Sequence, residues 1–152
     1  RNIRIQESFA VGILLQGTNQ GEFENLMIAQ CTVGIGLAGG LNGWPFDLYF
    51  NNVRFYDNVT ADIATLGQAT GSATLGTLSA AENITFERPK FMDRGGTPVP
   101  NYANIAVTAA VNCGFYDFYA ARDVADATLM QLPADWIALG HSAAGVESII
   151  GA

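Results

Sequence analysis

Apolar and polar residues alternate in a four-residue motif, Asn-aliphatic-any-apolar, that occurs five times along the chain. Its second and fourth residues are apolar and the third is variable, which is the period of a strand with one buried face. Repetition at intervals of roughly 20 to 50 residues is typical of stacked structural units. The copies are Asn2–Ile5, Asn25–Ile28, Asn52–Phe55, Asn83–Phe86 and Asn104–Val107, at steps of 23, 27, 31 and 21 residues.

The leading Asn of each motif suits a corner, because its amide tolerates a left-handed backbone and can stack on the Asn of the next unit. A second pattern, Gly or Asp followed by an apolar residue, lies about ten residues later and predicts another corner. It occurs at Gly12-Ile13, Gly34-Ile35, Asp62-Ile63 and Gly114-Phe115. Further strands are expected at 13–16, 35–37, 63–66 and 115–119, with loops at 39–46, 68–81 and 92–102. The pattern predicts an all-β chain, a right-handed parallel β-helix with two or three strands per turn.

The two ends of the chain differ in this pattern. We expect residues 1–120 to form the coils and residues 121–152 to form an irregular C-terminal cap or an oligomerisation segment. Within that segment, 135–139 and 143–150 fit either short helices or terminal strands. Because the first motif begins at residue 2, we expect the chain to be a piece of a longer solenoid.

The composition of the chain limits the kinds of partner that it can bind. Charged residues are only 14% of the chain and hydrophobic residues are 49%, yet no apolar run reaches 18 residues, so no membrane span is expected. The net charge is −7, and only three of the seven bases lie close together in sequence, in a loose cluster at 88–94, which argues against nucleic acid. Apolar residues at outward positions (Leu14, Met27, Ala106, Tyr116) suggest a lateral interface. Packing of identical coils around a three-fold axis, a homotrimer, would bury it.

No cofactor or metal site is expected. Cys31 and Cys113 are far apart in sequence and have no metal-ligand neighbours, so we interpret them as small buried residues. Gly34–Gly39 matches the G-x-G-x-x-G pattern of dinucleotide sites, but Gly40, Gly43 and Pro45 follow where a helix would have to begin. We therefore assign it to a corner of the coil.

Carboxylates on neighbouring coils offer candidate chemistry. Equivalent residues of adjacent coils lie about 4.8 Å apart, and glycoside hydrolysis needs two carboxyl groups about 5–10 Å apart. Glu87 and Asp57 are the candidate catalytic residues, with Arg54 and Tyr56 beside them as substrate-binding residues. The same cluster also fits a lyase site, in which a base such as Arg or Tyr lies beside a group that neutralises the acid of the substrate. The alternative is a solvated outer face.

Aromatic residues in an expected corner loop offer a candidate sugar-binding site. Trp44, Phe46, Asp47 and Tyr49 combine ring faces with a carboxylate. Sugars stack their C–H faces on aromatic rings while their hydroxyl groups meet polar side chains. The alternative is that Trp44 and Phe46 fold back over the coil or pack on another subunit.

The Asn motif and the Gly-apolar corner together make residues 2–120 resemble the right-handed parallel β-helix superfamily, the pectate-lyase-like solenoids. Low charge, irregular coil lengths and an apolar outer face look most like phage tailspikes or tail fibres. The resemblance implies a homotrimer on the virion tail, outside the cell, that binds bacterial surface polysaccharide. Two alternatives stay open: a polysaccharide depolymerase, hydrolase or lyase, using outward carboxylates, and a purely structural trimerisation segment. The calcium-binding acids and arginine pattern of pectate lyases are not visible in this chain.

Overall fold

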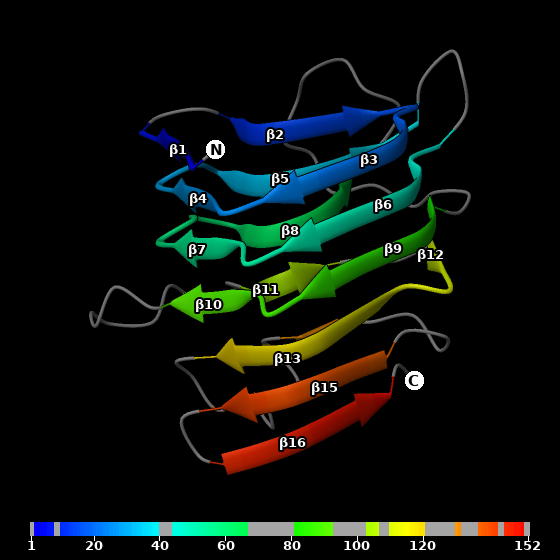
Figure 1. Ribbon diagram of the computed structural model, residues 1–152. Coiled ribbons are helices and arrows are strands. Elements are labelled where there is room, and N and C mark those ends of the chain that lie inside the picture. The colour runs from blue at the N-terminus through cyan, green and yellow to red at the C-terminus, as the bar shows by residue number, and fades with distance from the viewer. Residues whose placement is uncertain are drawn as a thin grey trace.

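The computed structural model describes residues 2–7, 10–39, 44–66, 81–92, 103–106, 110–120, 130–131, 137–142 and 145–150. Over these ranges the chain is all-β, with sixteen strands and no helix. The strands form an 11-stranded curled sheet and a 5-stranded sheet, and most of them pair in parallel (Figure 1). The described part accordingly has no helix able to cross a membrane.

Every third strand stacks in parallel on the strand of the same kind in the next turn of chain, so that three columns form. The first column is β1 (Ile3–Gln6), β4 (Leu26–Ala29), β7 (Arg54–Tyr56) and β10 (Lys90–Met92). The second column is β2 (Val11–Gln16), β5 (Val33–Ala38), β8 (Ala61–Leu66), β11 (Ala103–Ala106) and β14 (Met130–Gln131). The third column is β3 (Asn19–Glu24), β6 (Phe46–Asn51) and β9 (Ala81–Glu87), with β12 (Ala110–Val111) paired to β9.

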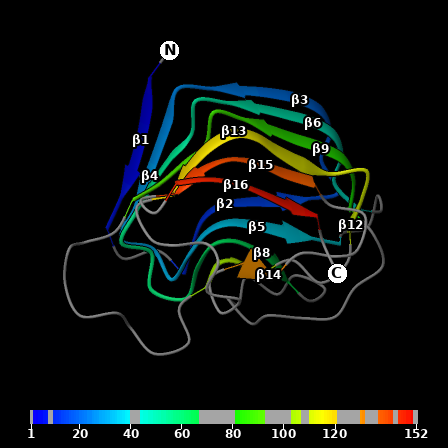
Figure 2. The same ribbon diagram turned by 90° about the horizontal axis from the view of Figure 1, so that it is seen from below.

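One long strand, β13 (Gly114–Ala120), joins the first and third columns into one sheet. Its first half pairs with β9, its second half pairs with β10, and its register on the next strand shifts between Tyr116 and Phe118. β15 (Ile137–Ser142) continues the parallel stack on β13, and β16 (Gly145–Ile150) pairs with β15 antiparallel. The terminal-strand alternative for this segment is therefore confirmed, and parallel pairing continues past residue 120. Figure 2 shows the curl of the sheet from below.

Left-handed backbone marks three corners per turn, and each corner repeats from coil to coil. The three sets of corner residues are Asn25, Asn52, Arg88 and Asp117 (φ 54°, 54°, 53° and 52°), Gln20, Asp47, Asn83 and Asn112 (φ 53°, 54°, 53° and 51°), and Glu7, Gln30 and Asp57 (φ 72°, 58° and 54°). Asn and Asp predominate because their short polar side chains tolerate this conformation best after Gly. The predicted contact of one Asn with the next occurs at Asn52, which donates to Asn25 at 2.7 Å, whereas Asn83 donates to the Asp47 carboxylate at 2.9 Å.

Each of the five Asn motifs contributes residues to a parallel strand, but the leading Asn residues do not all stack on one another in one column. The copies at Asn2, Asn25 and Asn52 share the first column. The copy at Asn83 lies in the third column and the copy at Asn104 in the second. Each column turns alternate residues toward the main core, so a four-residue pattern cannot distinguish between columns.

The second pattern predicts its strands correctly for three of its four members, but the corners expected there are wrong. Gly12, Gly34 and Asp62 lie within β2, β5 and β8, and none of them has a positive φ. The two glycines are required by close packing instead, because added Cβ atoms would lie 2.8 and 2.5 Å from a carbonyl oxygen of the next strand. Ile13 pairs with Ile35, and Ile35 with Ile63, along the second column. Gly114-Phe115 instead belongs to β13 and pairs with β9, whereas Ile105 continues the column from Ile63. The loop expected at 39–46 is also too long, because β6 begins at Phe46.

Stacked phenylalanine rings run through the centre of the coils. Phe23, Phe50, Phe86 and Phe115 follow one another with ring centroids 4.6, 4.5 and 5.0 Å apart. A second stack, Phe55 on Phe91, has its centroids 5.3 Å apart. Both cysteines are buried in this core, as predicted.

A smaller apolar cluster lies on the other face of the second column. Ala64 and Leu66 alternate along β8 with Ile63, which faces the main core, and they cluster instead with Ala38. All three are buried within the chain itself. The burial of these outward apolar residues therefore needs no second subunit.

Candidate functional site

Side chains of β6 and β9 form a hydrogen-bonded set on the outer face of the third column. The hydroxyl group of Tyr49 donates to a carboxylate oxygen of Glu87. The guanidinium group of Arg88 lies 3.9 Å from the other oxygen of Glu87 and donates to Oδ1 of Asn51 at 2.8 Å. Strand alternation explains this outward placement, because Leu48 and Phe50 occupy the core between these positions.

The electrostatics of the set centre on Tyr49. Its hydrogen bond to Glu87 holds the pKa of Tyr49 above the ordinary value, with burial and the negative charges of Glu87 and Glu24 acting in the same direction and Arg88 opposing them. A proton kept on the phenol makes Tyr49 a hydrogen-bond donor at neutral pH.

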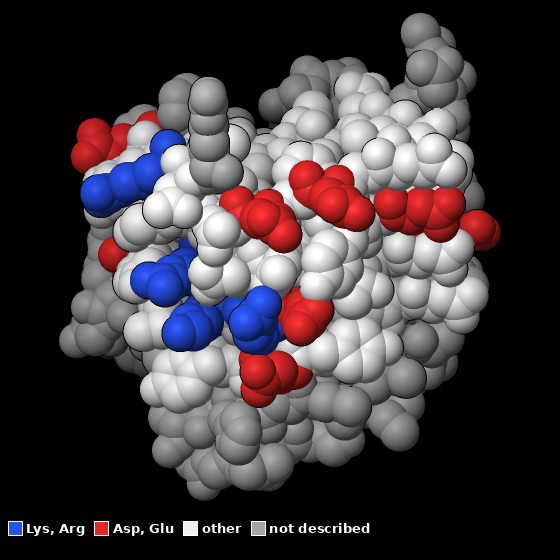
Figure 3. Space-filling view, in the orientation of Figure 1, with Lys and Arg blue, Asp and Glu red and all other residues white. Residues whose placement is uncertain are grey.

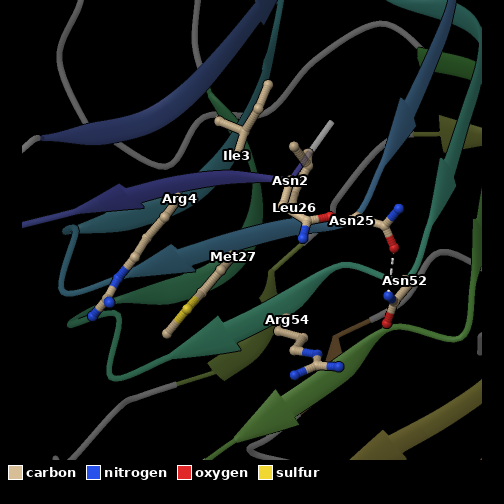
Figure 4. Close-up of a pocket in the computed structure, with 8 residues that line it drawn as sticks. All are labelled: Asn2, Ile3, Arg4, Asn25, Leu26, Met27, Asn52 and Arg54. Carbon is tan, nitrogen blue, oxygen red and sulfur yellow. Dashed lines mark hydrogen bonds between the residues drawn. The ribbon is translucent and has the colours of Figure 1, made fainter.

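A hollow of about 320 Å³ lies around the start of the first column (Figure 4). Amides and two guanidinium groups surround an apolar floor: the lining residues are Asn2, Ile3, Arg4, Asn25, Leu26, Met27, Asn52 and Arg54. The hydrogen bond between Asn52 and Asn25 forms one wall. Such a mixture of apolar and hydrogen-bonding groups suits a ligand with both characters, as sugars have.

The hydrogen-bonded set and the hollow meet at the corner of Asn25, Asn52 and Arg88. Asn51, which binds Arg88, directly precedes Asn52, which lines the hollow. On the visible face, basic residues gather over the side of the first column, and most acidic residues lie over the side of the third column, with others at the outer left edge (Figure 3). The corner is therefore a charge boundary.

Glu24 and Glu87 lie on the same row of the third column, with Asn51 between them. Glu24 pairs in register with Asn51, and Asn51 pairs with Glu87. Two strand spacings place their Cα atoms about 10 Å apart. In glycosidases that invert the anomeric centre, the two carboxyl groups are about 6.5–9.5 Å apart, which these side chains can match.

Asp57, the other candidate catalytic carboxylate, does not lie with Glu87. Asp57 is a corner residue beyond the far end of β7, while Glu87 ends β9 beside the near end of β7. About five extended residues separate the two corners, on the order of 15 Å. Tyr56 pairs with Ala29 and Met92 near the Asp57 end. The structure thus groups Glu87 with Tyr49 and places Arg54 across the corner.

The aromatic segment is a strand and not a corner loop. Phe46, Asp47 and Tyr49 belong to β6, and Asp47 uses its carboxylate to hold Asn83. The indole of Trp44 covers Gly39, where an added Cβ would lie 2.4 Å from the ring. Trp44 therefore folds back over the coil, as the alternative interpretation has it, and of this segment only Tyr49 joins the hydrogen-bonded set.

The sequence also suggests Arg88 beside Glu87 and identifies Tyr116 as an outward residue, but it does not place Glu24, Asn51 or the exposed Tyr116, which pairs with Glu87, in the candidate site. The spacing of Phe23, Phe50 and Phe86 could have located them. Each of these phenylalanines is buried or half-buried, so the residue after it points outward.

Other motifs have structural roles. Gly34 and Gly36 lie within β5, where added Cβ atoms would lie 2.5 Å from the Asp62 carbonyl oxygen and 2.4 Å from Leu66. Asn58, of the sequon Asn58-Val59-Thr60, is buried and accepts from the backbone N–H of Cys31 at 3.0 Å. Among the described residues, no group of three or more His, Cys, Asp and Glu side chains is placed to hold a metal ion.

Three comparisons with known proteins find no match: no model of a protein family, no curated protein and no solved structure is similar to the chain. Function is therefore inferred from the geometry of this surface.

Proposed function

We propose that the chain is a segment of a right-handed parallel β-helix that binds polysaccharide on its outer face. Parallel pairing of every third strand supports the solenoid. Seen from below, the strands run counterclockwise as later coils approach the viewer, which supports the right hand (Figure 2). A solenoid offers an extended lateral surface suited to a polymer.

One observation carries the binding proposal: the set Tyr49–Glu87–Arg88–Asn51 adjoins the hollow of Asn25, Asn52 and Arg54 on one open face. Carboxylate, amide and guanidinium groups bind sugar hydroxyls in pairs, while Tyr49 and Tyr116 offer ring faces. The face spans several coils, so it fits several sugar units in a row.

The setting we propose is a homotrimeric phage tailspike or tail fibre on the virion, outside the cell, whose ligand is bacterial surface polysaccharide. The sequence resemblance supports it, as do exposed apolar residues on the lateral surface. The large ones are Ile3, Leu14, Val59, Tyr116 and Tyr119. Sedimentation equilibrium tests the proposed trimer directly. A molecular mass equal to that of the monomer at every concentration would contradict it.

Binding is tested on an array of bacterial capsule and O-antigen polysaccharides, followed by calorimetry on any ligand found. Glu87→Gln and Tyr49→Phe should each weaken binding by about tenfold, the equivalent of one charged hydrogen bond. Glu82→Gln is the matched control, because Glu82 is exposed at the opposite end of β9. Equal affinities of the Glu87→Gln and Glu82→Gln variants would show that Glu87 is not part of the binding site.

The row Glu24–Asn51–Glu87 favours a second function, a polysaccharide hydrolase. One carboxyl group would protonate the leaving oxygen while the other takes a proton from the attacking water. The raised pKa of Tyr49 disfavours the lyase alternative, because a phenol that keeps its proton is a poor base.

Hydrolysis is tested by incubating bound polysaccharides with the protein and measuring chain length and new reducing ends. Glu24→Gln and Glu87→Gln should each abolish cleavage, with Glu82→Gln as control, and the fresh product should have inverted configuration by NMR. An unsaturated, ultraviolet-absorbing product would indicate a lyase instead. Binding with no shortening of any chain would leave only the binding function.

A further inference from the structure

Four of the seven basic residues of the chain lie at or beside the first column, although the net charge of the chain is −7. Arg4 pairs with Met27, Met27 with Arg54, and Arg54 with Lys90. Arg88 occupies the adjoining corner. We call Arg4, Arg54 and Lys90 the cation ladder.

The cation ladder faces outward. Ile28, Phe55 and Phe91, the next residues along β4, β7 and β10, are buried in the core, so the ladder residues lie on the opposite face. Arg4 and Arg54 are exposed, and both line the hollow, on the same side of neighbouring strands as Met27 (Figure 4). Among the described residues, no carboxylate lies within 4.0 Å of any ladder cation.

Strand spacing sets the intervals between these charges. Arg54 and Lys90 are on adjacent strands, about 5 Å apart at Cα, and Arg4 and Arg54 are two strands apart, about 10 Å. A polymer lying along the coil axis therefore meets positive charge at intervals close to the length of one or two sugar units.

The outer face of the third column, next to the ladder, carries negative charge that repels carboxylate groups. Glu22, Glu24 and Glu87 point outward from the third column, beyond the corner. These glutamates repel the carboxylate groups of an anionic polymer, whereas the ladder attracts them, so a polymer lying along the corner turns its carboxylates toward the first column and its hydroxyl groups toward Glu87.

We propose that the cation ladder is a binding site for the carboxylate groups of an acidic, uronate-bearing polysaccharide laid along the coil axis. This inference rests on the proposed polysaccharide-binding function and adds the charge and direction of the ligand. Arginine suits the role because its planar fork pairs with carboxylates through two parallel hydrogen bonds.

The test compares polyuronates of three linkages (alginate, hyaluronan and polygalacturonate) with the same polymers after their carboxyl groups are reduced to alcohols. At least one polyuronate should bind about tenfold more tightly than its reduced form. The difference should shrink as salt is raised from low ionic strength to about 0.15 M. Arg54→Gln and Lys90→Gln should each reduce binding of the polyuronate about tenfold. Lys90 does not line the hollow, so Lys90→Gln should also leave binding of the reduced polymer unchanged.

Arg54→Lys keeps the charge but loses the fork, so its affinity for the polyuronate should lie between those of the parent protein and Arg54→Gln, which separates electrostatic binding from a structural role. Glu82→Gln is again the remote control. Should Arg54→Gln fail to fold, Lys90→Gln and the salt series still decide the question.

Equal binding of charged and reduced polymers would overturn the ladder while leaving the proposed function in place. Absence of binding to these polymers and to every capsule or O-antigen would overturn both. Tighter binding to duplex DNA than to any polyuronate would also overturn the inference, since the ladder would then be a phosphate site.

Discussion

The side-chain amide of Asn52 donates a 2.7 Å hydrogen bond to Oδ1 of Asn25, one coil away, and both residues have a φ of 54°. The residue at this position must therefore adopt a left-handed backbone and also make a polar contact with the next coil. Asn satisfies both, because its short side chain tolerates the backbone and its amide is donor and acceptor at once. This relationship explains why Asn begins the motif at these coils.

Two substitutions of Asn52 separate the contribution of its backbone conformation from that of its hydrogen bond. Asn52→Ala should lower the free energy of unfolding by about 1–2 kcal/mol, because Ala pays for the left-handed backbone and loses the amide bond. Asn52→Gly should cost about half as much, because Gly accepts the backbone freely. Urea denaturation of the three proteins measures the difference. Equal losses for both variants would show that the backbone preference of Asn contributes nothing here.

Arg88 holds the same corner position as Asn25 and Asn52 but lacks their tolerance of a left-handed backbone. Strained residues are often retained for a functional side chain, and this one contacts Glu87 and Asn51. Arg88→Asn should therefore raise the unfolding free energy by about 0.5–1 kcal/mol, through a better corner and an extended amide ladder. The same variant should bind polysaccharide more weakly.

Asp117→Asn provides the control for Arg88→Asn, because it places Asn at an equivalent corner that does not line the hollow. Thermal unfolding and calorimetry give both quantities. A variant Arg88→Asn that is less stable and binds normally would show that Arg88 is structural.

Much of the fold could be predicted because its determinants are local. A buried strand face alternates every second residue, and Asn at a corner follows from backbone geometry, so the strands around Ile28, Ile35, Phe55 and Ile63 were found. The assignment of strands to columns was partly wrong, because it depends on loop lengths that no four-residue pattern records. β3 and β6 were missed for the same reason, although Phe23 and Phe50 repeat there.

The candidate site was harder to predict than the fold. Glu87 and Arg54 were identified from their outward positions, but pairing Glu87 with Asp57 required a register that places Tyr56 beside Glu87. The observed register places Asn51 there instead. A shift of register moves every neighbour, so side-chain partners depend on the whole stack and not on local spacing.

The Tyr49–Glu87 hydrogen bond has a consequence in alkaline solution. Because the pKa of Tyr49 is raised above about 10, the folded protein holds this proton more tightly than the unfolded chain does. The resulting stability is fully present below about pH 10 and is lost as pH rises through the higher folded pKa. The difference in phenolate absorbance between the parent protein and Tyr49→Phe should therefore appear above pH 10.

Glu87→Gln should move the titration of Tyr49 to lower pH, because it removes the negative charge that opposes phenolate formation. Glu82→Gln, at the other end of β9, should leave it in place. A phenolate titration for Tyr49 that is unchanged by Glu87→Gln would exclude the hydrogen bond in solution.

The phenylalanine stack predicts unequal costs along its length. Phe50 is fully buried between Phe23 and Phe86, whereas Phe23 is partly buried and has one ring neighbour in the stack. Each ring pair contributes about 0.5–1.5 kcal/mol beyond area burial, so Phe50→Leu should destabilise the protein by about 1 kcal/mol more than Phe23→Leu. Denaturant unfolding at several protein concentrations measures both. Equal losses would mean that the first coil is covered in solution, and a concentration-dependent midpoint would identify the cover as another copy of the chain.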